Sequence, residues 1–211
     1  MILYSEDKNL NVIFAHVPKT GGTSIEKAFG HVVEGAHGKH SDIKEIRDFL
    51  FTNDKQDYYN QAFKFTIVRN PFDQLYSFWN YHTYLLKTSY FQFSEDFNQF
   101  LTTLNLRDKS VAECQVRPGL DIDKAQIVWG QLFQKPYAYI GEELQMDFIG
   151  RFEFLHRDFN LIKRITGLTS SLPHLNKAFN KKPYWTRYNH EGRKIAEELL
   201  EEDLKTFNYK F

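Results

Sequence analysis

The sequence predicts an α/β protein in which a mostly parallel sheet is flanked by helices and helix outweighs strand. Three short apolar segments are typical of buried strands: Val12–Ala15, Phe63–Val68, and Asp147–Gly150 after Tyr137–Ile140. Segments with helical periodicity lie between and after these strands. Strands that alternate with helices favour a parallel sheet wrapped by helices.

The helical pattern covers Ser24–Phe29, Asp42–Phe51, Phe72–Leu86, Phe93–Leu104, Asp121–Phe133, Asp158–Gly167 and Glu191–Phe207. Loops are expected at Glu34–His40, Lys109–Leu120 and Thr169–Tyr188. The last two are long for a compact domain, which indicates working loops. We find no repeat, low-complexity tract or linker, so the 211 residues are expected to form a single domain.

Composition excludes several classes of protein. The 27 basic and 27 acidic residues balance, so no bulk attraction to nucleic acid or to an anionic membrane is expected, and an anion site has to be local. The single cysteine, Cys114, rules out an internal disulfide and argues against a zinc finger. No signal peptide is visible, and no apolar run approaches the roughly 20 residues that a membrane helix needs. We expect a cytoplasmic protein without an integral membrane segment.

The segment between the first strand and the first helix has the composition of a phosphate-binding loop. Gly21 and Gly22 let the backbone approach an anion, and the first N–H groups of the following helix point at it. Lys19 adds a point charge. The hydroxyl donors of the segment are Thr20, Thr23 and Ser24. Thr23 and Glu26 stand three apart, as in a capping box, which predicts a helix start at Thr23 or Ser24.

A second strand runs into a second helix start. Arg69 follows the strand Phe63–Val68, at the end where open α/β sheets bind ligands. Asn70 suits the cap and Pro71 the first turn of the next helix. Ser77 lies one to two turns into that helix, on a face that could look back towards Arg69. A guanidinium and a hydroxyl in this arrangement could hold a second phosphate.

A nucleotide kinase or NTPase is the main competing class. Its loop places lysine after the glycines, in the order G-x-x-x-x-G-K-[ST]. Here Lys19 precedes Gly21 and Gly22, and Val17 stands where the first glycine belongs. The second strand ends in Arg69, with no aspartate well placed for magnesium. A transferred sulfuryl group carries less negative charge than a phosphoryl group, so a lysine and backbone amides could suffice without metal.

The two loops carry a family resemblance. Residues Pro18–Ser24 resemble the 5′-phosphosulfate loop of the sulfotransferases that use 3′-phosphoadenylyl sulfate (PAPS), and Arg69–Asp73 with Ser77 resembles their 3′-phosphate motif. Residues Ile149–Leu155 and Leu172–Asn176 resemble later blocks of the carbohydrate, or polysaccharide-type, branch. This resemblance implies a P-loop-NTPase-like sulfotransferase fold, PAPS as donor, PAP as product and no metal.

The same resemblance implies roles for the site residues. Lys19 would neutralise the leaving phosphate oxygen, while the amides and hydroxyls of the loop would hold the 5′-phosphate of the donor. Arg69 and Ser77 would bind the 3′-phosphate. Arg151 would either reach the nucleotide or pair structurally with Glu153.

The general base is less defined by the sequence. A histidine after the first helix acts as base in polysaccharide-type relatives, and His40 matches it best, with His37 as the second candidate. Glu34 and Glu153 are further alternatives. The alternative to a catalytic role is that His40 simply precedes a helix that is capped at Ser41.

The leading hypothesis is therefore metal-independent transfer of a sulfuryl group from PAPS to a hydroxyl of a glycan or glycan-like acceptor. The alternatives are a P-loop-like nucleotide kinase or NTPase and a non-catalytic PAP-binding module. No sequence feature names the acceptor or the oligomeric state.

Overall fold

In a computed structural model of the chain, the described residues are 2–5, 8–33, 38–86, 89–104, 106, 109–110, 116–173 and 183–211. They fall into two compact units. The first unit consists of Met1–Arg69 and Gln134–Ala178, and the second of Asn70–Phe133 and Phe179–Phe211. Each unit has its own hydrophobic core.

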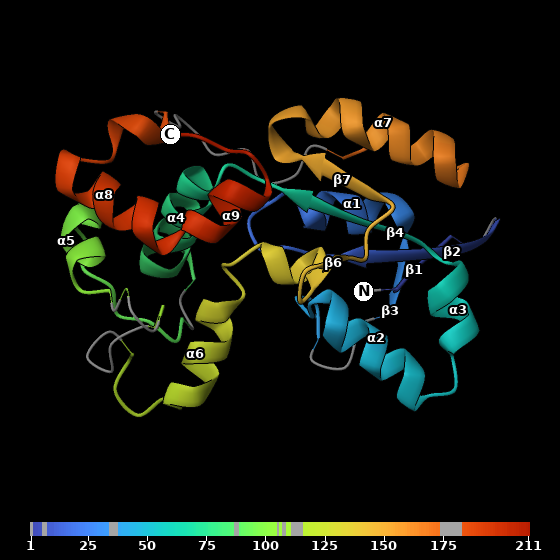
Figure 1. Cartoon of the computed structure of the whole chain (residues 1–211), viewed down its shortest axis with the longest axis horizontal. Coiled ribbons are helices and arrows are strands. Elements are labelled where there is room, and N and C mark those ends of the chain that lie inside the picture. The colour runs from blue at the N-terminus through green and yellow to red at the C-terminus, as the bar shows by residue number, and fades with distance from the viewer. Residues whose placement is uncertain are drawn as a thin grey trace. The chain divides into compact units, whose positions relative to one another are not determined.

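A five-stranded sheet in the order β3-β1-β2-β4-β7 forms the centre of the first unit (Figure 1). Its strands are β1 (Ile2–Ser5), β2 (Lys8–Ala15), β3 (His31–Val33), β4 (Phe63–Val68) and β7 (Phe148–Arg151). The three predicted strands β2, β4 and β7 run parallel, which confirms the expected fold class. The strands β1 and β3 were not predicted. They extend the sheet on one side by antiparallel pairing.

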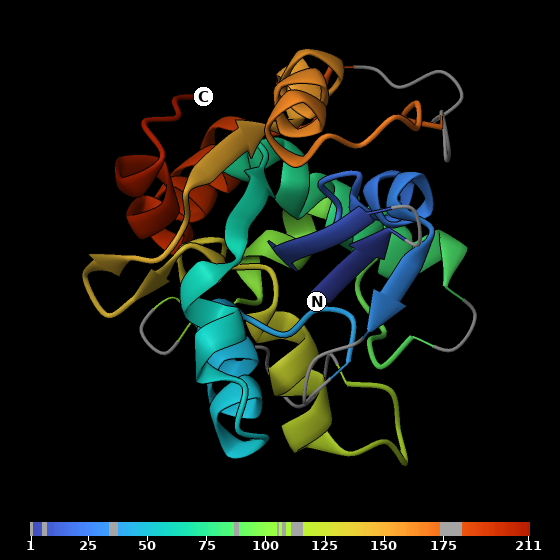
Figure 2. The ribbon, with the colours of Figure 1, turned by 90° about the vertical axis from the view of Figure 1, so that its right-hand side faces the viewer.

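Helices cover both faces of this sheet. They are α1 (Gly22–Phe29), α2 (Ile43–Thr52), α3 (Gln56–Gln61) and α7 (Leu155–Thr166). Alternate side chains of β2 and β4, among them Phe14 and Phe65, pack against Phe29 of α1 and Phe159 of α7. The views in Figures 1 and 2 place α7 and α2 on opposite sides of the sheet. Helix α3 was not predicted, because its polar sequence carries no apolar period.

The segment before β7 differs from the prediction. Tyr137 belongs to a 3-10 turn, η3 (Lys135–Tyr137), and not to a strand. The short strands β5 (Tyr139–Ile140) and β6 (Glu143–Leu144) then form a separate hairpin. After β7, a second 3-10 turn, η4 (Phe152–Phe154), leads directly into α7, which therefore begins three residues earlier than the sequence predicts.

The second unit is helical in its regular structure. Its elements are α4 (Pro71–Asn80), the π-helical turn η1 (Tyr81–Leu85), α5 (Phe97–Thr102), α6 (Ile122–Gly130), the 3-10 turn η5 (Tyr184–Thr186), α8 (His190–Leu199) and α9 (Glu201–Thr206). The core is aromatic: the ring of Trp129 meets Phe78 at 5.7 Å and Phe100 at 6.2 Å, both edge to face. No helix among the described residues is long and apolar enough to cross a membrane.

Two helix predictions in this unit are wrong in their bounds. The expected helix Glu191–Phe207 breaks at Leu200, where both Leu199 and Leu200 are buried. Adjacent residues of a continuous helix point about 100° apart, so the break lets both leucines enter the core. The helix expected from residue 93 begins only at Phe97, because the Asp96 side chain accepts the Gln99 N–H and caps it there.

Candidate functional site

The predicted site residues of the first unit lie at one edge of the sheet. The parallel strands β2, β4 and β7 end at Ala15, Val68 and Arg151, and Val68 pairs with Arg151 in register. The loop from His16, the side chain of Arg69 and the turn after Arg151 therefore start from the same carboxyl edge. This is the edge at which open α/β sheets bind ligands.

Helix α1 begins without a side-chain cap. Its N-cap is Gly21, with φ of 83°, and no side chain in the described part of the chain caps its first turn. The capping box predicted from Thr23 and Glu26 is thus wrong, as is the predicted start, because the helix begins at Gly22. Five other helices are capped by Asp or Asn, namely Asp42, Asn70, Asp96, Asp121 and Asn189. Helices α3, α7 and α9 also begin without a side-chain cap, but of these uncapped starts only that of α1 follows the glycine turn. The uncapped start leaves N–H groups directed at the loop, an arrangement that suits an anion.

The ring of His16 explains the second glycine of the loop. A Cβ on Gly22 would lie 2.1 Å from two atoms of the His16 ring, far inside van der Waals contact. That ring is buried and stacks on Phe14 with the ring centroids 5.3 Å apart. Gly22 therefore serves close packing at the sheet edge.

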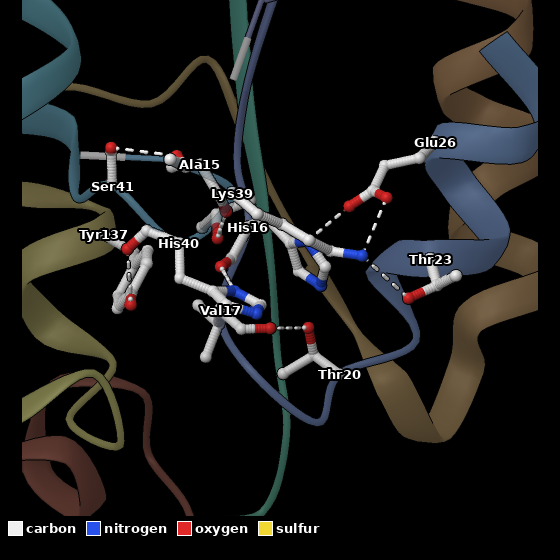
Figure 3. A network of polar contacts seen from close by, with 12 residues as sticks. Ala15, His16, Val17, Thr20, Thr23, Glu26, Lys39, His40, Ser41 and Tyr137 are labelled. Carbon is white, nitrogen blue, oxygen red and sulfur yellow. Dashed lines mark hydrogen bonds and ion pairs between the residues drawn. The ribbon is translucent and has the colours of Figure 1, made fainter. Parts of the chain in front are cut away.

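The three loop hydroxyls have different surroundings. Thr20 is buried and its Oγ1 donates to the Val17 carbonyl at 2.8 Å, which closes the turn (Figure 3). Thr23 is exposed and its Oγ1 accepts from Lys39 at 3.1 Å. Ser24 is buried in the first turn of α1. Lys19 has φ of 66°, a left-handed conformation that is uncommon for a lysine and is held by the surrounding turn.

Arg69 links the two predicted motifs. Its Nη1 donates to the Lys19 carbonyl at 2.7 Å, and its guanidinium carbon lies 4.4 Å from the centroid of the Phe152 ring. Gln134 holds the main chain of Arg69 from both sides: its Oε1 accepts the Arg69 N–H and its Nε2 donates to the Arg69 carbonyl, each at 2.8 Å. Nothing in the sequence around Gln134 indicates this role.

His40 is held in a defined tautomer. Its Nδ1 lies 2.9 Å from the His16 carbonyl, and a carbonyl can only accept, so Nδ1 carries the proton and Nε2 the lone pair. The Tyr137 hydroxyl donates to the His40 carbonyl at 3.0 Å and fixes the main chain. Burial, and after it the electrostatic effect of the neighbouring His16, lowers the pKa of His40 to about 3. A general base works best with a pKa near the operating pH, so His40 is a weak base in the free protein.

Glu26 is the centre of the polar network beside His40. One carboxylate oxygen lies 2.5 Å from His16 Nδ1 and the other 2.9 Å from Lys39 Nζ (Figure 3). Burial opposes ionisation of Glu26, yet the contacts with His16 and Lys39 hold its pKa below the ordinary value. Burial lowers the pKa of His16, so a neutral imidazole faces an ionised carboxylate. A hint in the sequence was the position of Lys39 directly before the candidate base.

The remaining predicted residues are placed as follows. Ser77 lies half-buried on α4 in the second unit. Arg151 ends β7, and its main-chain N–H donates to Asp158 at 2.7 Å. Glu153 is exposed on η4, and His37 and Glu34 lie outside the described residues.

The helix after His40 has a different cap from the one predicted. The Asp42 side chain accepts from the Glu45 N–H at 2.8 Å and so caps α2. The Ser41 hydroxyl instead donates to the Gly38 carbonyl at 3.0 Å.

The uncapped helix start, the glycine turn and the arginine lie at the carboxyl edge of a parallel sheet, an arrangement in an α/β protein that suits an anion. The sulfotransferase family model matches residues 3–210, and the chain therefore belongs to the sulfotransferase family. The predicted family and enzyme class are confirmed, and the protein is a sulfotransferase. No curated protein and no solved structure matches the chain. Within the described residues, no group of three or more His, Cys, Asp or Glu side chains is arranged to hold a metal ion.

Proposed function

We propose that this sulfotransferase transfers the sulfuryl group of PAPS to a hydroxyl of a glycan or glycan-like acceptor, without a metal ion. The observation that carries the proposal is the uncapped start of α1 directly behind Lys19, Gly21 and Gly22. Backbone N–H groups and a helix dipole at such a start favour the 5′-phosphate, which carries one charge in the donor and gains a second when the sulfuryl group leaves. A transferred sulfuryl group carries less negative charge than a phosphoryl group. The single positive charge of the lysine ammonium therefore suffices to neutralise it without a metal ion.

The donor would be held by residues of both motifs. The amides of Gly21, Gly22 and Thr23 and the hydroxyls of Thr23 and Ser24 are the proposed ligands of the 5′-phosphate. The Ser24 N–H and the Thr20 hydroxyl instead hold the turn, because they donate to the carbonyls of Gly21 and Val17. The assignment of Arg69 and Ser77 to the 3′-phosphate, and of Arg151 to the nucleotide, stays a prediction from the sequence. The bond from Arg69 to the Lys19 carbonyl supports this assignment indirectly, because it makes the loop conformation depend on the arginine.

We assign His40 as the general base. Its Nε2 lone pair would accept the proton of the acceptor hydroxyl while the acceptor oxygen bonds to sulfur and the bond from sulfur to the 5′-phosphate oxygen breaks. Lys19 would neutralise the charge that develops on that departing oxygen. The low pKa keeps the His40 ring neutral in the free protein, and the negative charge of a bound donor would raise the pKa toward a value suited to a base. His37 remains the second candidate base.

The acceptor class rests on the resemblance to the carbohydrate branch, and the cytoplasmic location stays a prediction from the sequence. We propose that the acceptor is a carbohydrate hydroxyl of an intracellular precursor and that the transfer takes place in the cytoplasm. A single sulfotransferase domain of 211 residues likewise stays a prediction.

The first experiment is calorimetric titration of the protein with PAP, with and without Mg²⁺, and with ATP as competitor. We expect micromolar binding of PAP that does not respond to Mg²⁺. Lys19→Ala should weaken it by about tenfold or more, since one lost charge-assisted contact is worth roughly 1.5–3 kcal/mol. Lys27→Ala is the matched control, because Lys27 is exposed in the last turn of the same helix.

Two other outcomes would replace the proposal. Binding and hydrolysis of ATP that requires Mg²⁺, without PAP binding, would identify a nucleotide kinase or NTPase. Tight PAP binding without turnover on any acceptor, and without an effect of His40→Ala, would identify a binding module.

A further inference from the structure

Glu26 joins two segments that are separate in the sequence. It projects from α1 and receives His16, from the end of β2, on one carboxylate oxygen and Lys39, from the turn before α2, on the other. The Glu26 and His16 side chains are 15% and 3% exposed, so this contact is largely shielded from water. A shielded hydrogen bond to an ionised carboxylate is stronger and more costly to break than an exposed one.

Lys39 makes two contacts with the same helix. Its Nζ lies 2.9 Å from Glu26 and donates to Thr23 Oγ1 at 3.1 Å, and these two partners are one turn apart on α1. Lys44 of α2 provides a contrast, because its pair with Asp48 lies within one helix and the lysine is 61% exposed. The Lys39 contacts therefore connect the turn before α2 to α1, whereas the Lys44 contact stays within α2.

The turn that Lys39 ties down carries His40. The His40 ring lies 4.5 Å from the His16 ring and bonds to the His16 carbonyl, so its position depends on the place of this turn against the end of β2 (Figure 3). Glu26 contacts both parts, since it binds His16 at the end of β2 and Lys39 in the turn before α2. His16, which starts the anion loop, and Lys39, the residue before the proposed base His40, are thus both held by the Glu26 carboxylate.

We propose that Lys39 and Glu26 are positioning residues, which fasten the His40 turn to the first turns of α1 and so hold the imidazole in its Nδ1–H tautomer beside the anion loop. The expected effect on turnover rests on the proposed function. The contacts that hold the His40 turn against α1 do not depend on it. Lys39 acts through His40 in this scheme and is not a donor ligand.

The test compares Lys39→Met with Lys44→Met and with the conservative Lys39→Arg. The first readout is the nitrogen NMR of histidine-labelled protein, in which protonated and unprotonated ring nitrogens have distinct shifts. We expect His40 to show the Nδ1–H tautomer in the wild type and in Lys44→Met, and a mixture of tautomers in Lys39→Met. The second readout compares kcat for sulfuryl transfer with the Kd for PAP. Lys39→Met should lower kcat by about tenfold or more and leave the Kd for PAP within about twofold, because only the geometry of the base has changed. Lys39→Arg should restore most of the loss.

Glu26→Gln serves as the second variant, since it keeps the shape of the side chain and removes its charge; it should reproduce both effects if Lys39→Met does not fold. Unchanged His40 shifts in a folded variant would overturn the inference. A parallel loss of PAP affinity in Lys39→Met would overturn it as well, because Lys39 would then contact the donor. If the wild type transfers no sulfuryl group while the tautomer still responds to Lys39→Met, the proposed function fails and the positioning pair stands.

Discussion

The packing of His16 against Gly22 leads to a quantitative prediction for Gly22→Ala. The added Cβ would lie 2.1 Å from two ring atoms of His16 and 2.6 Å from a third. The ring has little room to retreat, because it is 2% exposed, stacks on Phe14 and contacts Glu26. Overpacking of this kind costs about 1–3 kcal/mol, while replacing a helical glycine by alanine gains at most about 1 kcal/mol. We expect a net loss of about 2 kcal/mol in the free energy of unfolding.

Urea unfolding measures this change, with the slope of the transition checked for constancy. Gly130→Ala is the matched control, because Gly130 also lies in a helix, α6, and a Cβ there would meet nothing within 4 Å. It should be neutral or stabilising by up to about 1 kcal/mol. In a His16→Ala background the obstacle is gone, so Gly22→Ala should become nearly neutral. The double-mutant cycle should give a coupling energy of about 1.5 kcal/mol or more.

Equal costs of Gly22→Ala in both backgrounds would refute this reasoning, since the loss would then come from the loop conformation and not from His16. A wild-type stability for Gly22→Ala would refute it as well.

Three further predictions concern the surroundings of the loop. The pKa of His40 is about 3 in the folded protein and about 6.5 in the unfolded chain, so between these pH values only the unfolded chain binds the extra proton. The stability that depends on a neutral His40 is therefore complete above pH 6.5 and is lost as the pH falls toward 3. His40 alone should lower the unfolding free energy by about 2 kcal/mol between pH 7 and pH 5, and urea titrations at both pH values should show a smaller decrease in His40→Asn. Arg69→Lys keeps the charge but loses the planar group that donates to the Lys19 carbonyl and covers Phe152, so it should destabilise by about 1–3 kcal/mol in the same assay; no loss would contradict the link between the motifs. Tyr137→Phe leaves the His40 carbonyl without its donor at 3.0 Å and should cost about 1 kcal/mol in thermal or urea unfolding, whereas an unchanged midpoint would argue against that bond.

The sequence predicted those parts of the site that depend on near neighbours. The glycine turn after β2 and the place of Arg69 at the end of β4 follow from an apolar run, a turn residue and a helix start within a few positions. The expected pattern of a capping box, in contrast, misled at Glu26. The spacing from Thr23 is compatible with a cap, but two partners brought by the fold compete for the same carboxylate.

The sequence by itself therefore determined the α/β class, the parallel strands and the composition of the anion loop. The tertiary structure decided which side chains serve the loop: Lys39 reaches Thr23 across 16 positions, His40 reaches His16 across 24, and Gln134 reaches Arg69 across 65. Periodicity and turn chemistry act over one or two turns of chain, so they leave a local trace in the sequence. A hydrogen bond between distant segments leaves none, because its geometry exists only after the sheet and its helices have packed.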